Sequence, residues 1–182
     1  MIEIKTSRLV VRNFRASDAA DLFAYLKNPT ASCFLSLRLN DLAHARAEAE
    51  KRSASDDYLA VCRTDTGQMI GDLFAIPEGD TFAVGWNFNP ASGGNGYAGE
   101  AAHALFAFLF KSRNARRLYA YVEDDNVSSQ RLCERLGMRQ EGLFLEFVTF
   151  RNDIDGVPIY ENTLQYAILR GEWETTRGSQ TE

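Results

Sequence analysis

The sequence predicts an α+β domain built on a mixed, mostly antiparallel sheet of about seven strands. Three observations lead to this prediction. Strand-like and helix-like stretches follow one another in the order β-α-α-β-β-β-α-β-α-β-β. Links of only a few residues join the three middle strands, which is typical of antiparallel hairpins. A helix then separates residues 81–88 from the strand around Leu118, which is typical of a parallel crossover.

The first third of the chain is predicted to hold one or two strands and two helices. The opening residues 1–8 are strand-like, and the β-branched, apolar residues 8–14 predict a strand. Ser17-Asp18 is typical of a helix start, and the helical apolar spacing that follows ends at Asn28-Pro29. A second helix is expected over residues 40–52, at the surface because its apolar stripe is thin.

The rest of the chain supplies most of the predicted sheet. Strands are expected at 58–63, 69–77, 81–88, 118–122, about 138–150 and 159–169. Residues 97–111 are apolar on most sides, which predicts a helix buried at the centre of the domain. Residues 126–136 form an amphipathic pattern, and Gly137 is the expected end of that helix.

The length and charge of the chain limit the function classes. A chain of 182 residues fits one domain, predicted over residues 1–173, followed by a polar tail over 174–182 with no apolar periodicity. The net charge of −5 argues against a non-specific nucleic-acid binder, so no nucleic-acid partner is expected.

Cysteine usage and hydropathy point to a reducing compartment. Cys33, Cys62 and Cys133 are too few and too dispersed for a disulfide framework or a zinc cluster. No run approaches the roughly 18 apolar residues of a membrane helix, and the opening lacks the apolar stretch of a signal peptide. We therefore expect no membrane partner and a cytoplasmic location.

The sharpest sequence feature is the glycine-rich stretch Gly93-Gly-Asn-Gly-Tyr-Ala-Gly99, between a predicted strand and the predicted central helix. Glycines let successive backbone N–H groups point into one concavity, and the positive end of the following helix adds to their field. Such a site suits a phosphate or pyrophosphate. The alternative is a flexible loop in which glycine only permits positive φ.

A dinucleotide site is a second interpretation of the same loop. Residues 94–99 match the pattern G-x-G-x-x-G, and Glu123 ends the next predicted strand, where a ribose-binding acid would stand. That motif normally opens its domain and follows its strand at once, whereas here a long segment precedes it and residues 89–93 intervene. A dinucleotide-binding oxidoreductase is therefore kept as the weaker alternative.

Three blocks of sequence, in order, resemble the GNAT superfamily of acyl-CoA-dependent N-acyltransferases, and most closely the branch of ribosomal-protein N-terminal (alanine/serine) acetyltransferases. They are Val84-Gly-Trp-Asn-Phe-Asn-Pro90, Gly94-Asn-Gly-Tyr-Ala-Gly-Glu-Ala101 and Asn126-Val-Ser-Ser-Gln-Arg-Leu-Cys-Glu-Arg-Leu-Gly-Met138. The resemblance implies a central mixed sheet with helices on both faces and an acyl-CoA site where the strands splay apart. It also implies acetyl-CoA as co-substrate and no metal.

The resemblance assigns cofactor contacts by position. The backbone of the glycine loop would hold the pyrophosphate of CoA, and the end of the preceding strand would bond its pantetheine arm. Arg131 is a candidate for the ribose phosphate. The full set that the resemblance implies is Asn87, Phe88, Gly93, Gly94, Asn95, Gly96, Tyr97, Ala98, Gly99, Asn126, Ser129 and Arg131.

Two positions depart from the family pattern. Gly93 stands where Gln or Arg is usual, which removes one side-chain contact to phosphate but leaves the backbone cradle. Cys133 stands where many members carry the tyrosine that protonates the departing thiolate, so Cys133 is either a substitute acid or a buried packing thiol. Ser129 resembles the serine proposed for that role in the ribosomal-protein branch; alternatively it satisfies first-turn donors of its own helix.

The general base is open among several carboxylates. Glu146 lies between apolar neighbours that would favour proton uptake, although it also fits the solvent-facing position of an alternating strand. Glu100, Glu141 and Glu161 are weaker candidates, and Glu100 also simply complements a helix start. We therefore take Ser129, Glu146 and Cys133 as the candidate catalytic residues.

The expected function is transfer of an acetyl group from acetyl-CoA to a primary amine, on a protein or peptide N-terminus or on a small molecule. Residues 28–52 and 152–158 would frame the acceptor site, as they do in the family. A non-catalytic acyl-CoA-binding module is the alternative, because the usual tyrosine is missing. A homodimer is compatible with the sequence, as is a monomer.

Overall fold

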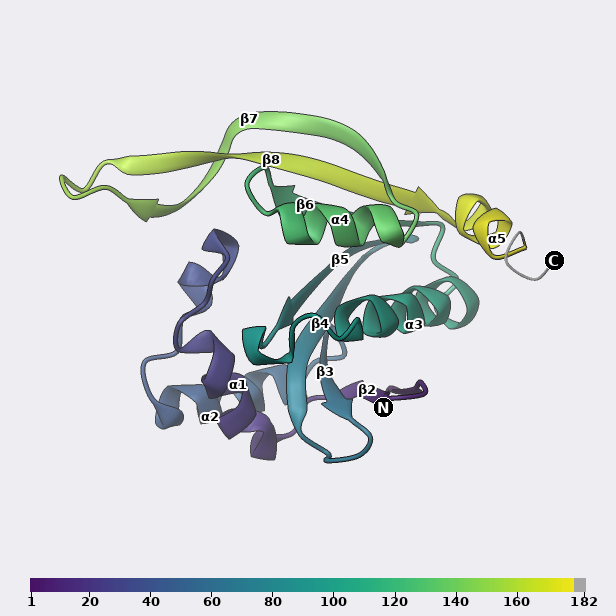
Figure 1. Cartoon of the computed structure of the whole chain (residues 1–182), viewed down its shortest axis with the longest axis horizontal. Helices are drawn as coiled ribbons and strands as arrows, with labels where there is room; N and C mark the ends of the chain where they lie inside the picture. The colour runs from purple at the N-terminus through teal and green to yellow at the C-terminus, as the bar shows by residue number, and fades with distance from the viewer. Residues whose placement is uncertain (179–182) are drawn as a thin grey trace.

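The computed structural model describes residues 1–178 and has an eight-stranded sheet with helices on both faces (Figure 1). The strands lie in the order β1-β2-β3-β4-β5-β6-β8-β7. Their bounds are Glu3–Lys5, Leu9–Asn13, Tyr58–Arg63, Met69–Glu78, Thr81–Phe88, Arg117–Glu123, Arg139–Asn152 and Pro158–Leu169 for β1 to β8. The α-helices α1 to α5 are Ala19–Leu26, Leu42–Ser53, Tyr97–Ser112, Val127–Arg135 and Arg170–Gly178.

The sheet is split near its middle, where β5 and β6 pair in parallel over only a short stretch. The first five strands pair antiparallel with their sequence neighbours, and β6, β8 and β7 also pair antiparallel. The parallel contact between β5 and β6 covers only residues 81–83 and 117–119. Beyond it the two strands run on without pairing, so they splay apart as the resemblance implies.

The alternation of side chains along β3 builds two hydrophobic cores on opposite faces of the sheet. Leu59 and Val61 point into a large core with α3, α4 and Trp173. Ala60 and Cys62 point into a smaller core with α1 and α2. The prediction that α3 is buried centrally is confirmed, since Phe106 and its apolar neighbours lie in the large core.

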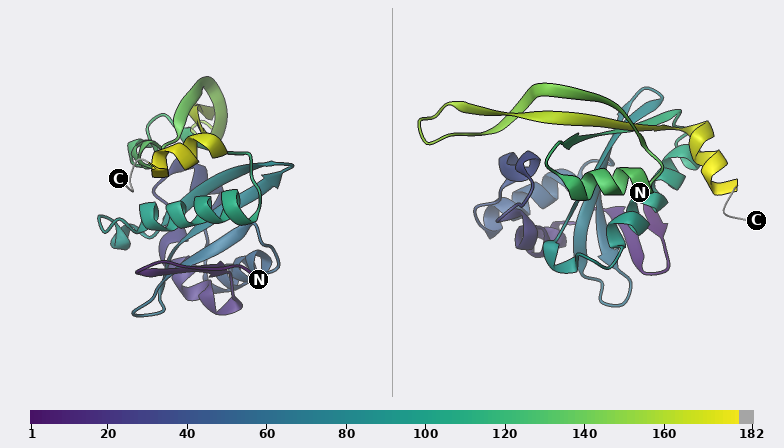
Figure 2. Two further views of the ribbon diagram at one scale, coloured as in Figure 1. Left: turned by 90° about the vertical axis from the view of Figure 1, so that its right-hand side faces the viewer. Right: turned by 45° about the horizontal axis from the view of Figure 1, so that its top comes forward.

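The hairpin of β7 and β8 is the longest feature of the fold. It extends past the body of the molecule in Figure 1 and in the right-hand view of Figure 2, and most side chains of β7 are exposed. Register shifts interrupt its pairing at three places, one of them between Phe144 and Val148. No helix within residues 1–178 is long and apolar enough to span a membrane.

Most predicted elements are found, with four differences. Glu3–Lys5 pairs with β2 as a strand of its own, so the sheet has eight strands instead of about seven. A 3-10 helix, Ser32–Leu37, lies in a stretch for which no element was predicted. Asp41 rather than Asn40 caps α2, because its Oδ1 accepts the His44 N–H at 2.8 Å. The helix α5 continues to Gly178, so residues 174–178 of the expected tail are helical; residues 179–182 lie outside the described part of the chain.

Candidate active site

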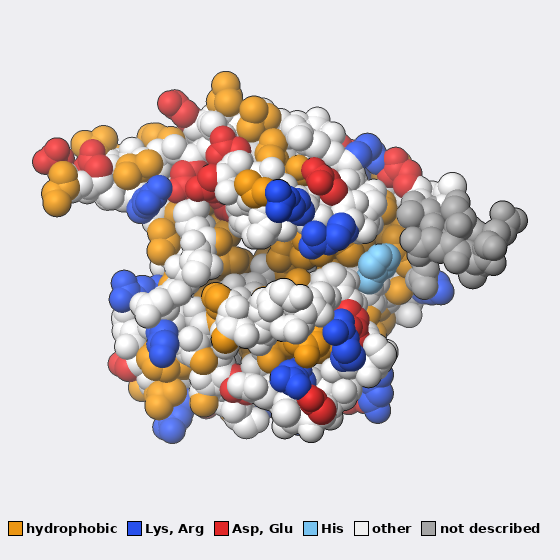
Figure 3. Space-filling model, in the orientation of Figure 1, with side chains coloured by type: hydrophobic (Ala, Val, Ile, Leu, Met, Phe, Trp, Pro, Cys, Tyr) orange, Lys and Arg blue, Asp and Glu red, His pale blue; other side chains and the backbone are white. Residues whose placement is uncertain are grey.

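The splayed strands enclose a cleft of about 1110 Å³. It is a recess between α4 above and the loop before α3 below (Figure 3). Its walls are the ends of β5 and β6, the loop 89–96, the first turns of α3 and α4, and residues 30–35. All of the cofactor residues implied by the resemblance line this cleft except Asn95 and Arg131.

The glycine loop forms one end of the cleft. Gly94 and Gly96 adopt φ values of 78° and 77°, which side chains rarely allow, and Gly96 is the N-cap of α3. The backbone N–H groups of Tyr97, Ala98 and Gly99 occupy the first turn of this helix, where no intrahelical acceptor exists. These donors, at the positive end of a sixteen-residue helix, form the cradle that an anion requires.

Asn95 shapes the loop from within. Its Nδ2 donates to the carbonyl oxygens of Ser92 and Gly93 at 3.2 and 3.0 Å. Asn89 reinforces the turn, since its Oδ1 accepts the Ala91 N–H at 3.0 Å. The Asn95 side chain is thus engaged by the loop itself, which explains why it is absent from the cleft wall.

A guanidinium holds the loop from outside. Arg8 donates from Nη1 to the carbonyl oxygen of Asn95 at 3.0 Å and from Nε to Glu100 Oε2 at 2.7 Å. Its guanidinium also lies over the ring of Tyr97, 4.8 Å from the ring centre. Burial opposes the charge of Glu100, but hydrogen bonds from Thr6 and Arg8 outweigh it and lower the pKa of this carboxyl. Glu100 therefore anchors the loop, and it does not line the cleft.

The end of β5 forms the wall of the cleft beside this loop. Asn87 and Phe88 bond to β4 on one side only, because β6 has already diverged on the other. Gly71 of β4 permits this packing: a Cβ there would lie 2.6 Å from the Asn87 carbonyl oxygen. The free edge of β5 can accept main-chain hydrogen bonds from an extended ligand.

The start of α4 brings Asn126 and Ser129 into the middle of the cleft. Asn126 Oδ1 accepts the Ser129 N–H at 3.2 Å, so Asn126 is the cap of its own helix. The Ser129 Oγ has a different partner, because it accepts the Trp86 Nε1–H at 3.2 Å. Ser129 therefore keeps its own hydroxyl proton for a ligand in the cleft.

Two other predicted residues lie away from the cleft. Cys133 is fully buried on the core-facing side of α4, and burial raises the pKa of its thiol to about 12. Glu146 is exposed on β7 within an irregular part of the hairpin, at φ 48°, and its backbone N–H donates to Asn162 Oδ1 at 2.9 Å. Neither residue lines the cleft, which is the site expected for both.

The remaining predicted residues have defined surroundings. Arg131 is exposed outside the cleft, whereas Arg135, one turn later, lines it. Glu141 pairs with Arg117 and Arg139 on the surface. Glu161 accepts a hydrogen bond from Ser32, a residue of the cleft wall, but does not itself line the cleft.

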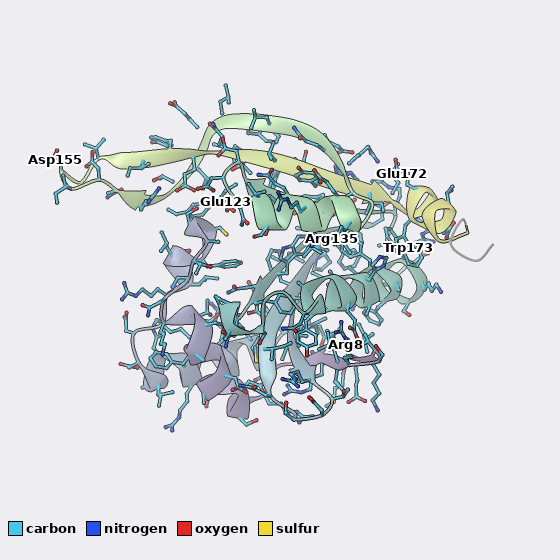
Figure 4. All side chains as sticks on the ribbon, viewed as in Figure 1. Arg8, Glu123, Arg135, Asp155, Glu172 and Trp173 are labelled. Atoms are coloured by element: carbon cyan, nitrogen blue, oxygen red, sulfur yellow. The ribbon has the colours of Figure 1, made fainter. Side chains whose placement is uncertain are left out.

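Glu123 is the residue that sequence reasoning missed as a site candidate. It lies at the end of β6, beside the start of α4 (Figure 4), and is only 6% exposed. It lines the cleft together with Trp86, and it lines a small recess beside the cleft together with Cys33. The sequence signal that could have identified it was its position three residues before Asn126, a residue already assigned to the site. Glu123 was interpreted from the sequence only as a ribose-binding acid of a dinucleotide site.

Comparison with known proteins supports the same identification. A family model described as an acetyltransferase (GNAT) domain matches residues 8–139. The uncharacterized N-acetyltransferase YnaD of Bacillus subtilis is 29% identical over 175 residues, covering 94% of this chain and 99% of the relative.

Solved structures have the same fold. A GNAT-family acetyltransferase from Bacillus anthracis superposes with a TM-score of 0.84 at 26% identity, covering 93% of this chain and 99% of that one. RimL, a ribosomal L7/L12 α-N-protein acetyltransferase solved with coenzyme A, superposes with a TM-score of 0.75 at 17% identity, covering 92% and 98%. The chain therefore belongs to the GNAT family of acetyltransferases and is an N-acetyltransferase.

Proposed function

We propose that this N-acetyltransferase moves an acetyl group from acetyl-CoA directly to a primary amine, either a protein N-terminus or a small-molecule amine. The observation that carries the proposal is the continuity of one cleft. It joins an anion cradle at the glycine loop, the free edge of β5, the Ser129 hydroxyl and a buried carboxylate. A phosphate, an extended arm, a thioester and an amine need these groups in this order.

Within this proposal, the amides of Tyr97, Ala98 and Gly99 bind the pyrophosphate of CoA, and the edge of β5 bonds its pantetheine arm. Ser129, which lines the cleft, would donate its proton to the departing sulfur. The acceptor would enter from the opposite end of the cleft, between residues 30–35 and the hairpin. RimL, which has the same fold, was solved with coenzyme A, and this supports coenzyme A as the ligand in the proposal.

A thermal-shift titration with acetyl-CoA, CoA and NADH in parallel tests the cofactor. A ligand at one hundred times its Kd adds about 2.7 kcal/mol of stability, which raises the melting temperature measurably. We expect stabilisation by acetyl-CoA and CoA and none by NADH. A shift with NADH alone would instead support the dinucleotide interpretation.

Turnover is then followed as thiol release from acetyl-CoA with three amine probes: a short peptide that begins with Ala, spermidine and kanamycin. Release that depends on one of these amines supports the transferase proposal. Binding of acetyl-CoA without amine-dependent release on a wide panel would leave a non-catalytic acyl-CoA-binding module.

A further inference from the structure

Glu123 is a buried carboxylate without a cationic partner among the described residues. The other two buried carboxylates of residues 1–178 both have one: Asp18 pairs with Arg12 at 2.8 Å, and Asp72 with Arg52 at 3.1 Å. The Glu123 carboxylate has two neutral partners instead: its Oε2 accepts the Asn126 Nδ2–H at a long 3.4 Å, and the Cys33 thiol is hydrogen-bonded to it.

The Cys33 thiol does not neutralise this carboxylate. Burial, and then the negative charge of Glu123, raise the pKa of Cys33, so the thiol stays uncharged. A buried carboxylate with no cation is costly to the free protein, because the charge has left water and gained no opposite charge. Such an arrangement persists where the missing cation arrives with a ligand.

The recess in front of Glu123 has the chemistry of an amine site. About 50 Å³ in volume, it is walled by the rings of Phe34 and Trp86, and Asn126 and Ser129 also line it. The same residues line the main cleft, so the recess opens onto the place where the thioester would lie. Apolar walls strengthen the attraction between a carboxylate and an ammonium group.

We infer that Glu123 binds the ammonium group of the acceptor and takes its proton. This inference rests on the proposed function and deepens it: the acceptor class is a primary amine that is cationic in solution. Glu123, which would touch the reacting nitrogen, replaces Glu146 as the general base.

The proton balance of the step is complete. The acceptor R–NH₃⁺ gives one proton to the Glu123 carboxylate, and the freed lone pair of R–NH₂ attacks the thioester carbonyl carbon. A C–N bond forms, the C–S bond breaks, and the sulfur leaves with its electron pair. The second nitrogen proton compensates the thiolate, either directly or through the Ser129 hydroxyl. Glu123 then returns its proton to solvent, so the products are R–NH–COCH₃, CoA–SH and H⁺.

The test compares Glu123→Gln with Glu134→Gln, the same chemical change on the exposed side of α4. With whichever of the three amine probes the wild type turns over, Glu123→Gln should lower kcat/KM about 100-fold or more while the acetyl-CoA Kd stays within about twofold. Glu134→Gln should leave both within about twofold. A turnover loss below about threefold in Glu123→Gln overturns the inference.

A weakly basic acceptor separates proton transfer from simple packing. Methoxyamine is already neutral at pH 7.5, so it needs no base to remove a first proton. The ratio of wild-type to Glu123→Gln turnover should be at least about tenfold smaller with methoxyamine than with the cationic probe. An equal ratio for both amines overturns the role as base.

The melting temperature of Glu123→Gln tests the inference without any acceptor amine. Because Glu123 is buried without a cationic partner among the described residues, Glu123→Gln should raise the melting temperature by about 2–4 °C. A lower melting temperature overturns the inference even if an acceptor is turned over. Failure of every amine probe with the wild type, in contrast, counts against the proposed function and leaves this readout to decide on Glu123.

Discussion

Ser129 is the hydroxyl at the start of α4 that lines the cleft and donates no hydrogen bond among the described residues. The cap of α4 is made by Asn126, and the Ser129 Oγ only accepts from Trp86. We predict that Ser129→Ala lowers kcat about 10- to 100-fold, because the departing thiolate loses its proton donor. The acetyl-CoA Kd, measured by calorimetry, should change by less than about twofold, because the backbone cradle is untouched.

A second variant distinguishes the hydrogen bond that the Ser129 hydroxyl accepts from Trp86 from the proton that it would donate to the sulfur. Trp86→Phe keeps an aromatic ring but removes the Nε1–H that Ser129 accepts, so it should reduce kcat less than Ser129→Ala does. An unchanged kcat in Ser129→Ala would remove Ser129 from the mechanism and leave solvent as the proton source.

Cys133 shows how burial decides the chemistry of a residue. Because burial raises its pKa to about 12, the thiol is protonated throughout the range in which the enzyme would be assayed. We predict that iodoacetamide at pH 8 leaves Cys133 and the buried Cys62 unmodified in the native protein, as read by mass spectrometry, and labels both in 8 M urea. Rapid native labelling of Cys133 would contradict its burial and reopen its role as an acid.

The residues of the site divide according to whether a local pattern determines their position. The glycines and Asn126 were predictable because a loop before a helix, and a helix cap, are local structures that carry their own signals. Glu146 and Glu123 were not, because only the pairing of β6 and β8 and the irregular register of β7 decide which carboxylate turns inward. A raised local hydropathy around Glu146 does not distinguish a cleft from an exposed hairpin.

At the scale of elements, the glycine loop depends on a strand far away in sequence. Arg8 joins the loop through Asn95 and joins the first turn of α3 through Glu100. We predict that Arg8→Ala weakens acetyl-CoA binding about three- to tenfold, since the loop must then be ordered at the expense of binding energy. Calorimetry with acetyl-CoA measures this change.

Two comparisons make this prediction specific. Arg8→Lys should recover only part of the affinity, because an ammonium cannot bond Asn95 and Glu100 in one fork. Arg116→Ala breaks an exposed pair with Asp80 outside the cleft and should leave the Kd within about twofold. Equal effects of Arg8→Ala and Arg116→Ala would show that the contact does not order the loop.

The elements themselves were predicted well where turns and periodicity agree. Strands β3 and β5 have the predicted bounds, because a short turn to β4 fixes one end of each. The 3-10 helix Ser32–Leu37 was not predicted, because it packs against β7, which follows it by more than 100 residues. The second half of α5, residues 174–178, was predicted as part of a tail for a similar reason: the helix is anchored by Trp173, which packs against Phe110 of α3.

For the molecule as a whole, one buried ion network fastens the α1–α2 layer to the sheet. Asp72 of β4 accepts a hydrogen bond from Tyr25 of α1 and pairs with Arg52 of α2 at 3.1 Å. Arg52 is 2% exposed and also lies over the rings of Phe14 and Tyr58. This network lies in the smaller core, on the face of the sheet opposite α3 and α4.

We predict that Arg52→Met destabilises the protein by about 3–5 kcal/mol in urea unfolding, because it leaves Asp72 buried without a cation. The double variant Arg52→Met/Asp72→Leu should recover at least half of the loss, since an apolar pair of similar volume can replace a buried ion pair. Failure of the double variant to recover stability would mean that packing of the Arg52 stem, and not its charge, holds the layer.

The pH dependence of the free energy of unfolding checks independently that the charge of Asp72 causes the stability loss in Arg52→Met. Burial raises the pKa of Asp72 even with Arg52 present to oppose it. Since the folded state of such a carboxyl holds its proton more tightly than the unfolded state, stability falls as pH rises from the unfolded value of about 3.9 through the folded one. Removing the cation raises the folded-state pKa of Asp72 further and so widens this pH window. The loss of unfolding free energy caused by Arg52→Met should therefore be larger at pH 8 than at pH 5.

The network lies across the sheet from α3 and α4, so acetyl-CoA affinity should be kept under all conditions in which the variant is folded. This result would separate the stability of the α1–α2 layer from the function of the cleft.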